Sequence, residues 1–383
     1  MARLGDICTI QSGGTPLRSN LEYWDNGTIP WVKISDFHGK YLSCTSEFIS
    51  QNGLDNSSAK IFSKGTILYT IFATLGEVCI LDIDAATNQA IAGLQIKDDS
   101  VISDFLYYYL LSKKEYVNEI GRGVAQNNIN MNILRNMEVF LPDVKVQTHI
   151  VREIEKVDNL ISLRKQQLSK LDELVKSRFV EMFGDPVTNE KDWPRLTLGD
   201  ICEIGSSKRV FEKDYVPQGI PFFRTKEIVE LSKGNPISTE LFISEEHFAE
   251  LKKTYGAPKK GDLLISAVGT IGTIWIVSGD FEFYFKDGNL MQIKSSPAFN
   301  SIFMKYLLDE LIANYKKEMS TGTAYSALTI VGLKKMLVYD VPLVLQEQFA
   351  TFVEQTDKSK FEIQKSLEKL ETLKKALMQK YFG

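Results

Sequence analysis

The sequence has few of the residue patterns that build catalytic or metal sites. Its four cysteines show no CxxC spacing, and none of its three histidines has a cysteine or a second histidine three or four positions away. It also lacks an Asn/Asp-Pro-Pro-aromatic motif for amino-group methylation, a GxGxxG after a strand and a GxxxxGK[ST] phosphate loop. We therefore expect no catalytic site, no metal and no cofactor in this chain.

Long apolar runs and an excess of positive charge are missing as well. No apolar run approaches the roughly 18 residues of a membrane span, and Met1-Ala2-Arg3 leads directly into LGDICTI, which we interpret as strand-like rather than as a signal peptide. We therefore predict a cytoplasmic protein with reduced thiols and no membrane partner. The formal net charge is −4, so a nucleic acid would have to be bound through local patches, or a partner protein would neutralise much of its phosphate charge.

The sequence does contain a long stretch, 144–183, without glycine or proline. Apolar residues recur in it every seven positions or on the alternate seam, and Arg164 and Arg178 interrupt them; the seam residues are Ile154, Val157, Ile161, Leu168, Leu171 and Val175. A seven-residue repeat keeps a narrow apolar stripe facing a partner helix, so the pattern predicts a coiled-coil helix. At about 1.5 Å per residue this helix spans on the order of 55 Å, which favours a spacer over a core helix.

The same pattern occurs twice in the chain, which predicts two tandem domains for its 383 residues. LGDIC, an IPW or IPF triplet and a KG pair stand in the same order at 4–8, 29–31 and 64–65, and again at 198–202, 220–222 and 260–261. The long stretch recurs at 343–383, where Gln346 matches Gln147 and Phe382-Gly383 match Phe183-Gly184. Lys360 and Lys374 interrupt its seam, which consists of Phe349, Ile363, Leu367, Leu370 and Leu377. We predict that the two helices pair as an antiparallel coiled coil, with a pseudo-two-fold relation between the repeats.

Each repeat has a β-rich start and a helical end. The apolar, β-branched segments 67–81 and 263–277 predict two short strands around a tight turn, and 103–121 and 300–319 predict helices with polar N-terminal caps. Tyr107, Tyr108 and Tyr109 fall on the first of these helices and are predicted to pack in the core or against a partner. The fold class is therefore α+β, with β-rich domains at 1–143 and 185–342 and long helices at 144–184 and 343–383.

Two divergent domains that each begin with LGDI and are each followed by a long helix ending in FG resemble the specificity subunit of type I restriction-modification systems. The resemblance covers the whole chain. It implies that the two domains are target-recognition domains, each reading one half of a bipartite, asymmetric site in double-stranded DNA. It implies that the paired helices set the distance between the half-sites. The sequence divergence of the two domains fits the reading of two different half-sites.

The resemblance also implies partners that carry the chemistry. Two methyltransferase (modification) subunits would dock on the helices, bind S-adenosylmethionine and methylate adenine in each half-site. Restriction/translocase subunits would use ATP and Mg²⁺ to act on unmodified DNA. The chain itself would be non-catalytic.

The polar loops of both domains are the candidate DNA-binding segments, because loops carry variable contacts on a fixed scaffold. Arginine can pair with guanine O6/N7 or a phosphate, and glutamine and asparagine can pair with adenine N6/N7. In the first domain the candidates are Thr15, Arg18, Asn20, Lys33, Ser35, Arg122, Gln126, Asn127 and Asn128. In the second domain they are Lys208, Arg209, Arg224, Lys226, Thr323, Tyr325 and Ser326. The glycines at 13, 14 and 76 are expected to serve backbone geometry instead.

Two other interpretations fit the same sequence. The chain is also compatible with the recognition subunit of a system in which the methyltransferase and the nuclease are fused, where only the partner differs. A scaffold or adhesion protein with two β-rich modules on a coiled coil is a third possibility, and the absence of an export signal argues against it. Specific retardation of a DNA duplex by the reconstituted complex would separate the first two from the third.

Overall fold

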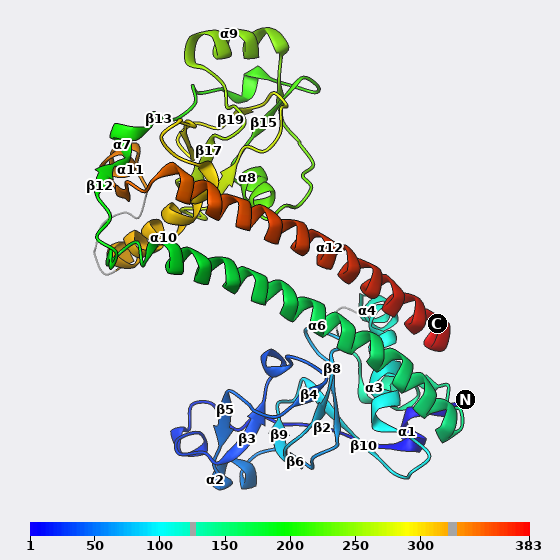
Figure 1. Cartoon of the computed structure of the whole chain (residues 1–383). Helices are drawn as coiled ribbons and strands as arrows, with labels where there is room; N and C mark the ends of the chain where they lie inside the picture. Colours follow the sequence, from blue (N-terminus) through cyan, green and yellow to red (C-terminus); the bar gives the residue numbers. More distant parts are fainter. Residues whose placement is uncertain (123–127, 321–327) are drawn as a thin grey trace. The chain divides into compact units, whose positions relative to one another are not determined.

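The computed structural model describes residues 1–122, 128–320 and 328–383, with the side chains of 120–122 and 319–320 excepted. It divides into two compact units (Figure 1). Unit 1 comprises Met1–Gln166 and Gln364–Gly383, and unit 2 comprises Gln167–Ile363. Each unit therefore holds one β-rich repeat together with a part of each long helix. The sequence repeat places the borders where the long helices begin, whereas the packing divides each long helix between the units.

The strands of unit 1 form two main sheets. The first has the order β2-β10-β7-β8-β4 and the second the order β5-β3-β9-β6. The strands of the first sheet are β2 (Cys8–Ser12), β10 (Ile91–Ile96), β7 (Ile67–Thr70), β8 (Val78–Leu81) and β4 (Tyr41–Leu42). Those of the second are β5 (Glu47–Ile49), β3 (Ile29–Val32), β9 (Ala85–Thr87) and β6 (Ile61–Phe62). β7 and β8 pair antiparallel, which confirms the predicted pair of short strands.

Unit 2 repeats most of this strand order, without counterparts of β4 and β6 and with the additional strand β14. Its first sheet is β13-β20-β17-β18, which corresponds to β2-β10-β7-β8, and its second sheet is β14-β16-β15-β19. The strands of the first sheet are β13 (Ile204–Gly205), β20 (Leu290–Ile293), β17 (Leu263–Ser266) and β18 (Ile274–Ile276). Those of the second are β14 (Tyr215–Val216), β16 (Phe242–Ile243), β15 (Ile220–Phe223) and β19 (Tyr284–Phe285). β15 pairs parallel with β19 as β3 does with β9, so the internal repeat is a repeat of topology.

The other helices lie between the strands and after them, and they differ more between the units than the sheets do. Unit 1 contains η1 (Leu21–Tyr23), η2 (Ile34–Asp36), α2 (Gln51–Asp55), α3 (Ser103–Ser112), α4 (Lys114–Arg122) and α5 (Met131–Arg135). Unit 2 contains η3 (Glu212–Asp214), α8 (Thr225–Ser232), α9 (Glu245–Tyr255), α10 (Ser301–Ser320) and α11 (Ile330–Lys335). The helix predicted over 103–121 thus forms as α3 and α4, whereas its counterpart α10 is continuous.

The LGDI segments are short helices, so the strand-like interpretation of LGDICTI is wrong for Leu4–Ile7 and right for the residues from Cys8 onward, which begin β2. α1 (Leu4–Ile7) follows the short strand β1 (Ala2–Arg3), which pairs with β11 (Glu138–Val139). In the same way α7 (Leu198–Ile201) follows β12 (Arg195–Thr197), which pairs with β21 (Leu337–Tyr339). Leu4 and Ile7 are both buried at helical spacing. The motif glycine allows close packing, because a Cβ on Gly5 would lie 3.2 Å from the Arg135 carbonyl oxygen.

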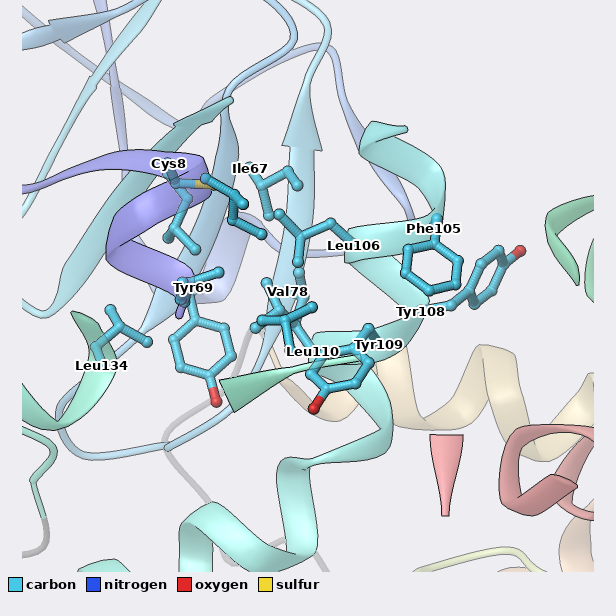
Figure 2. Packing of buried hydrophobic residues seen from close by; sticks show 14 of the residues in the cluster. Cys8, Ile67, Tyr69, Val78, Phe105, Leu106, Tyr108, Tyr109, Leu110 and Leu134 are labelled. Atoms are coloured by element: carbon cyan, nitrogen blue, oxygen red, sulfur yellow. The ribbon is translucent and has the colours of Figure 1, made fainter. Parts of the chain in front are cut away.

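Figure 2 shows part of the core of unit 1, which lies between the first sheet and α3. Tyr69 and Val78 come from β7 and β8, and Leu106 and Leu110 come from α3. The tyrosines of α3 pack as predicted: Tyr108 and Tyr109 are buried and Tyr107 is half-buried. Their hydroxyl groups are paired inside the unit, since Tyr108 donates to Asp158 Oδ2 at 2.9 Å and Tyr109 to the Glu138 carbonyl at 2.6 Å. The buried rings of Tyr108 and Tyr109 are therefore not available for base stacking.

The two long helices are α6 (Val144–Phe183) and α12 (Leu343–Phe382). In unit 1, Lys374 pairs with Asp158 at 2.6 Å and Lys165 with Glu371 at 3.5 Å, so the two helix segments run antiparallel (Figure 1). In unit 2, Lys360 pairs with Asp172 at 2.6 Å. The lysines that interrupt the predicted apolar seam of α12 thus form ion pairs with α6. All the predicted seam residues are buried or half-buried.

A buried glutamine fixes the start of each long helix. Gln147 accepts a hydrogen bond from the Ile102 N–H at 2.9 Å and donates to the Ser100 and Pro142 carbonyls at 2.8 Å. Gln346 accepts from the Asn300 N–H and donates to the Val341 carbonyl, both at 2.8 Å. The predicted polar cap at the start of α3 is wrong, because Ile102 precedes this helix and its N–H is satisfied by Gln147. At α10 the cap is confirmed, since Asn300 accepts from the Ile302 N–H at 2.9 Å.

Candidate nucleic-acid interface

The first polar loop of unit 1 lies where several strands end. The Gly13 N–H donates to the Ile91 carbonyl at 3.0 Å, and the Gly14 N–H donates to the Thr87 carbonyl at 2.8 Å. The backbone of Asn88 in turn donates to the Val32 carbonyl, which directly precedes Lys33, at 3.3 Å. The loops that follow β2 and β3 are therefore neighbours, as a shared binding surface requires.

Glycine is needed at both positions of the Gly13-Gly14 pair. A Cβ on Gly13 would collide with Thr87, and one on Gly14 would collide with the backbone of Ser58. The buried Trp31 indole N–H donates to the Gly14 carbonyl at 3.0 Å and so fixes the loop to the core. The predicted role of these glycines in backbone geometry agrees with this packing.

Two predicted DNA-binding cations of unit 1 meet at one acid, Glu47 on β5. Arg18 Nη1 lies 2.5 Å from Glu47 Oε2, and Lys33 Nζ lies 2.5 Å from Glu47 Oε1. The Arg18 guanidinium carbon lies 3.7 Å from the centroid of the Trp24 ring. Burial favours a higher pKa for Glu47, but the hydrogen bonds from Lys33 and Arg18 outweigh it and lower the pKa. We call Arg18, Lys33, Glu47 and Trp24 the first cation cluster.

The other candidates of unit 1 are not part of this cluster. Thr15 donates to Gln89, and Asn20 caps η1 by accepting from the Glu22 N–H at 3.2 Å, so both have structural partners. Ser35 is exposed on η2, and Asn128 forms an isolated β-bridge with Phe72. Gln126, Asn127 and the side chain of Arg122 lie outside the described residues.

Two predicted cations of unit 2 also share an acid. Arg224 Nη2 lies 2.8 Å from Glu240 Oε2 and 2.9 Å from Glu227 Oε1. Lys226 Nζ lies 3.3 Å from Glu240 Oε1. Hydrogen bonds from Arg224 and Lys226 lower the pKa of Glu240, and those to Glu227 and Glu240 raise the pKa of Arg224. We call Arg224, Lys226, Glu227 and Glu240 the second cation cluster.

The remaining candidates of unit 2 have partners elsewhere or are not described. Arg209 Nε donates to Asp287 Oδ2 at 3.1 Å. Lys208 Nζ lies 5.4 Å from the centroid of the Tyr255 ring, and its backbone N–H donates to the Tyr284 hydroxyl at 3.0 Å. Thr323, Tyr325 and Ser326 lie outside the described residues.

The two clusters occupy corresponding places in the two repeats. Lys33 follows β3 and Arg224 follows β15, and the backbone N–H of each donates to an acid three residues further on, Asp36 or Glu227, at 2.8 Å. The shared acid stands on or next to the neighbouring antiparallel strand, Glu47 at the start of β5 and Glu240 two residues before β16. Sequence reasoning missed both acids, because their separation from the cation differs, 14 residues in unit 1 and 16 in unit 2.

The chemistry of the candidate site is that of its cations. Among the described residues, no group of three or more His, Cys, Asp or Glu side chains could hold a metal ion. Burial raises the pKa of Cys8 and of Cys202 to about 12, so these thiols stay protonated at neutral pH. In contrast, arginine and lysine beside exposed loops suit phosphate oxygens and the edge of guanine. No helix in the described part of the chain is long and apolar enough to cross a membrane.

Comparisons with known proteins point to one family. The family model described as the type I restriction modification DNA specificity domain matches residues 1–173 and 190–375. The chain is similar to the type I restriction enzyme MjaIX specificity subunit of Methanocaldococcus jannaschii, with 26% identity over 99% of this chain and 91% of the relative.

Solved structures share the fold over the whole chain. The S subunit of a type I restriction-modification system from M. genitalium aligns with 100% of this chain and 95% of its own, with 17% identity and a TM-score of 0.56. A structure from a study of complex assembly and conformational transition of the type I system aligns with 100% of this chain and 96% of its own, with 19% identity and a TM-score of 0.62.

Proposed function

Because the chain belongs to the type I restriction-modification DNA specificity family, we propose that its two repeats read the two halves of one bipartite DNA site. The chain is the sequence-specificity subunit of such a system and is non-catalytic by itself. Its partners are DNA and the other subunits of the restriction-modification complex. The first cation cluster would contact one half-site and the second cation cluster the other.

One observation carries this proposal: the same cation cluster occurs in both units on the same sheet frame. In each cluster one cation, Lys33 or Arg224, directly follows the IPW or IPF strand, and it shares one acid with a second cation, Arg18 or Lys226, which comes from a different place in each repeat. The side chains around them differ, since Arg18 stacks on Trp24 in unit 1 whereas Arg224 also pairs with Glu227 in unit 2. A common frame with different contact residues is what two readers of different base sequences require.

The long helices provide the remaining functions of the proposal. They would set the distance between the half-sites and dock two methyltransferase subunits, which would bind S-adenosylmethionine and methylate adenine. Restriction/translocase subunits would bring ATP and Mg²⁺. The exposed apolar residues Leu160 and Leu163 on α6 and Leu373 on α12, all in unit 1, support a docking role for the helices.

Exchange of one recognition domain tests the proposal. The chain is co-expressed with its modification subunit, and the methylated motif is read by methylome sequencing for the wild type and for a chain in which 1–143 is replaced by the same domain of another family member. We expect a bipartite motif in the wild type, and a change in only one half of it in the exchanged chain. A change in both halves, or no defined bipartite motif in the wild type, contradicts the proposal.

A further inference from the structure

In both units the cations proposed to contact DNA are held by an acid. Glu47 binds Arg18 and Lys33 through separate oxygens, and Glu240 does the same with Arg224 and Lys226. The two acids stand within one residue of the same register on the chain beside the cation: Glu47 pairs with Trp31, and Glu240 directly precedes Leu241, whose carbonyl accepts from the N–H of Phe222, the counterpart of Trp31. An acid that holds two candidate DNA-binding cations thus occurs in both repeats. We therefore ask what such an acid does in DNA recognition.

We infer that Glu47 and Glu240 are specificity-determining residues, each of which holds the cations of its recognition domain until a matching DNA half-site replaces its carboxylate. The inference rests on the proposed function and deepens it. In this inference the acids weaken binding to DNA without the recognised sequence. The cations strengthen binding to DNA that has it. Specificity depends on the difference between the two affinities, so a group that weakens non-specific binding raises it.

Charge explains why the acid acts mainly on non-specific binding. Two cations and one carboxylate leave the group Arg18, Lys33 and Glu47 with one net positive charge, so an arbitrary phosphate gains less than it would from two free cations. A guanine edge accepts two hydrogen bonds from one arginine, which replaces the single hydrogen bond that Arg18 gives to Glu47 or that Arg224 gives to Glu240. A single phosphate does not present this pair of acceptors in the geometry of the guanine edge. The negatively charged carboxylate also repels the phosphate.

The acid can be displaced because its ion pairs are partly open to solvent. The side chains of Arg18 and Glu47 are 50% and 29% exposed, and those of Lys226 and Glu240 are 66% and 53% exposed. Ion pairs at such sites are weak and exchange readily. Arg18 is also fixed by stacking on Trp24, so that it keeps its direction after Glu47 releases it.

The isosteric variants Glu47→Gln and Glu240→Gln test the inference in the complex with the modification subunit. Affinity is measured for a duplex with the methylated motif and for a scrambled duplex, over a range of salt concentrations. We expect each variant to bind the scrambled duplex about fivefold more tightly, with a salt slope steeper by about one, while affinity for the correct site changes less. Methylome sequencing should show relaxed recognition in one half-site for Glu47→Gln and in the other for Glu240→Gln.

The matched controls remove the same charge at exposed sites outside the clusters. They are Asp99→Asn, in the turn between β10 and α3, and Glu250→Gln on α9. Thermal unfolding and binding of the modification subunit show whether each variant is folded. The further variants Glu47→Ala and Glu240→Ala remove the whole carboxylate group instead of replacing it by an amide. If Glu47→Gln and Glu47→Ala matched Asp99→Asn in scrambled-duplex binding and motif, while the wild type still methylated one bipartite site, the inference alone would fail. A wild-type complex without a defined site would overturn the proposed function and the inference together.

Discussion

Single residues that recur in both repeats keep the same structural role although their neighbours differ. Gln147 and Gln346 lie almost fully buried near the start of a long helix, and each binds the backbone at the start of an earlier helix of the same unit, α3 or α10. A buried amide can satisfy backbone groups that helix ends leave without a partner. The sequence match between these glutamines therefore reflects a joint between helices.

Replacement of Gln147 by leucine should loosen this joint. The variant leaves the Ile102 N–H and the Ser100 and Pro142 carbonyls without their partner, and we expect a cost of at least about 2 kcal/mol to the local stability of unit 1. Amide hydrogen exchange of α3 measures this cost. Gln166→Leu, at an exposed position of the same helix, is the control and should change the exchange little. Equal protection of α3 in both variants would contradict the proposed joint.

At the scale of elements, each long helix ends in the core of the unit that holds the other repeat. Phe382, at the end of α12, packs on Phe105 of α3 with ring centroids 5.4 Å apart. Phe183, at the end of α6, packs on Phe303 of α10 at 4.8 Å. Both rings are buried, so each unit is completed by a residue that the sequence attaches to the other repeat.

The two phenylalanines should therefore affect different units. We expect Phe382→Ala to destabilise unit 1 and Phe183→Ala to destabilise unit 2, each by about 3–5 kcal/mol, because a large buried ring is lost. Hydrogen exchange of α3 reports on unit 1 and that of α10 reports on unit 2, so each variant is the control for the other. Faster exchange of α3 in Phe183→Ala, with α10 unchanged, would be inconsistent with this assignment.

At the scale of the whole molecule, the paired helices carry the proposed spacer function. Their apolar seam is combined with ion pairs such as Lys374–Asp158 and Lys360–Asp172, which fix the register of the antiparallel segments within each unit. A spacer needs a fixed register, because slippage between the helices would change the distance between the half-sites.

Insertion of one helical heptad within 166–174 tests the spacer. Seven residues add about 10 Å of helix, so we expect the gap in the methylated motif to lengthen by at most about three base pairs while both half-sites stay the same. Methylome sequencing gives the motif. Insertion of seven residues in the exposed turn at 64–65 is the control and should leave the gap as it is. A heptad variant with an active complex and an unchanged gap would exclude the helices as the ruler.

The cation clusters show which part of the candidate site could be predicted from the sequence. Arg18, Lys33, Arg224 and Lys226 were predicted as contact residues, and the structure brings them together in pairs, although their contact with DNA stays a prediction. The acids that hold them were not found. A loop cation can be recognised from its position after a strand, whereas its partner depends on which residue of the next strand stands beside it.

The sequence by itself determined the features that local periodicity and internal repetition encode. Seven-residue spacing specified two long helices, and the two copies of one motif order specified two domains on one frame, because both signals are written in neighbouring residues. Only the tertiary structure decided the helical turn of LGDI, the joint at Gln147, the place of Phe183 in unit 2 and the acids of the clusters. These features depend on backbone hydrogen bonds and side-chain contacts between residues far apart in the chain, which no short-range pattern contains.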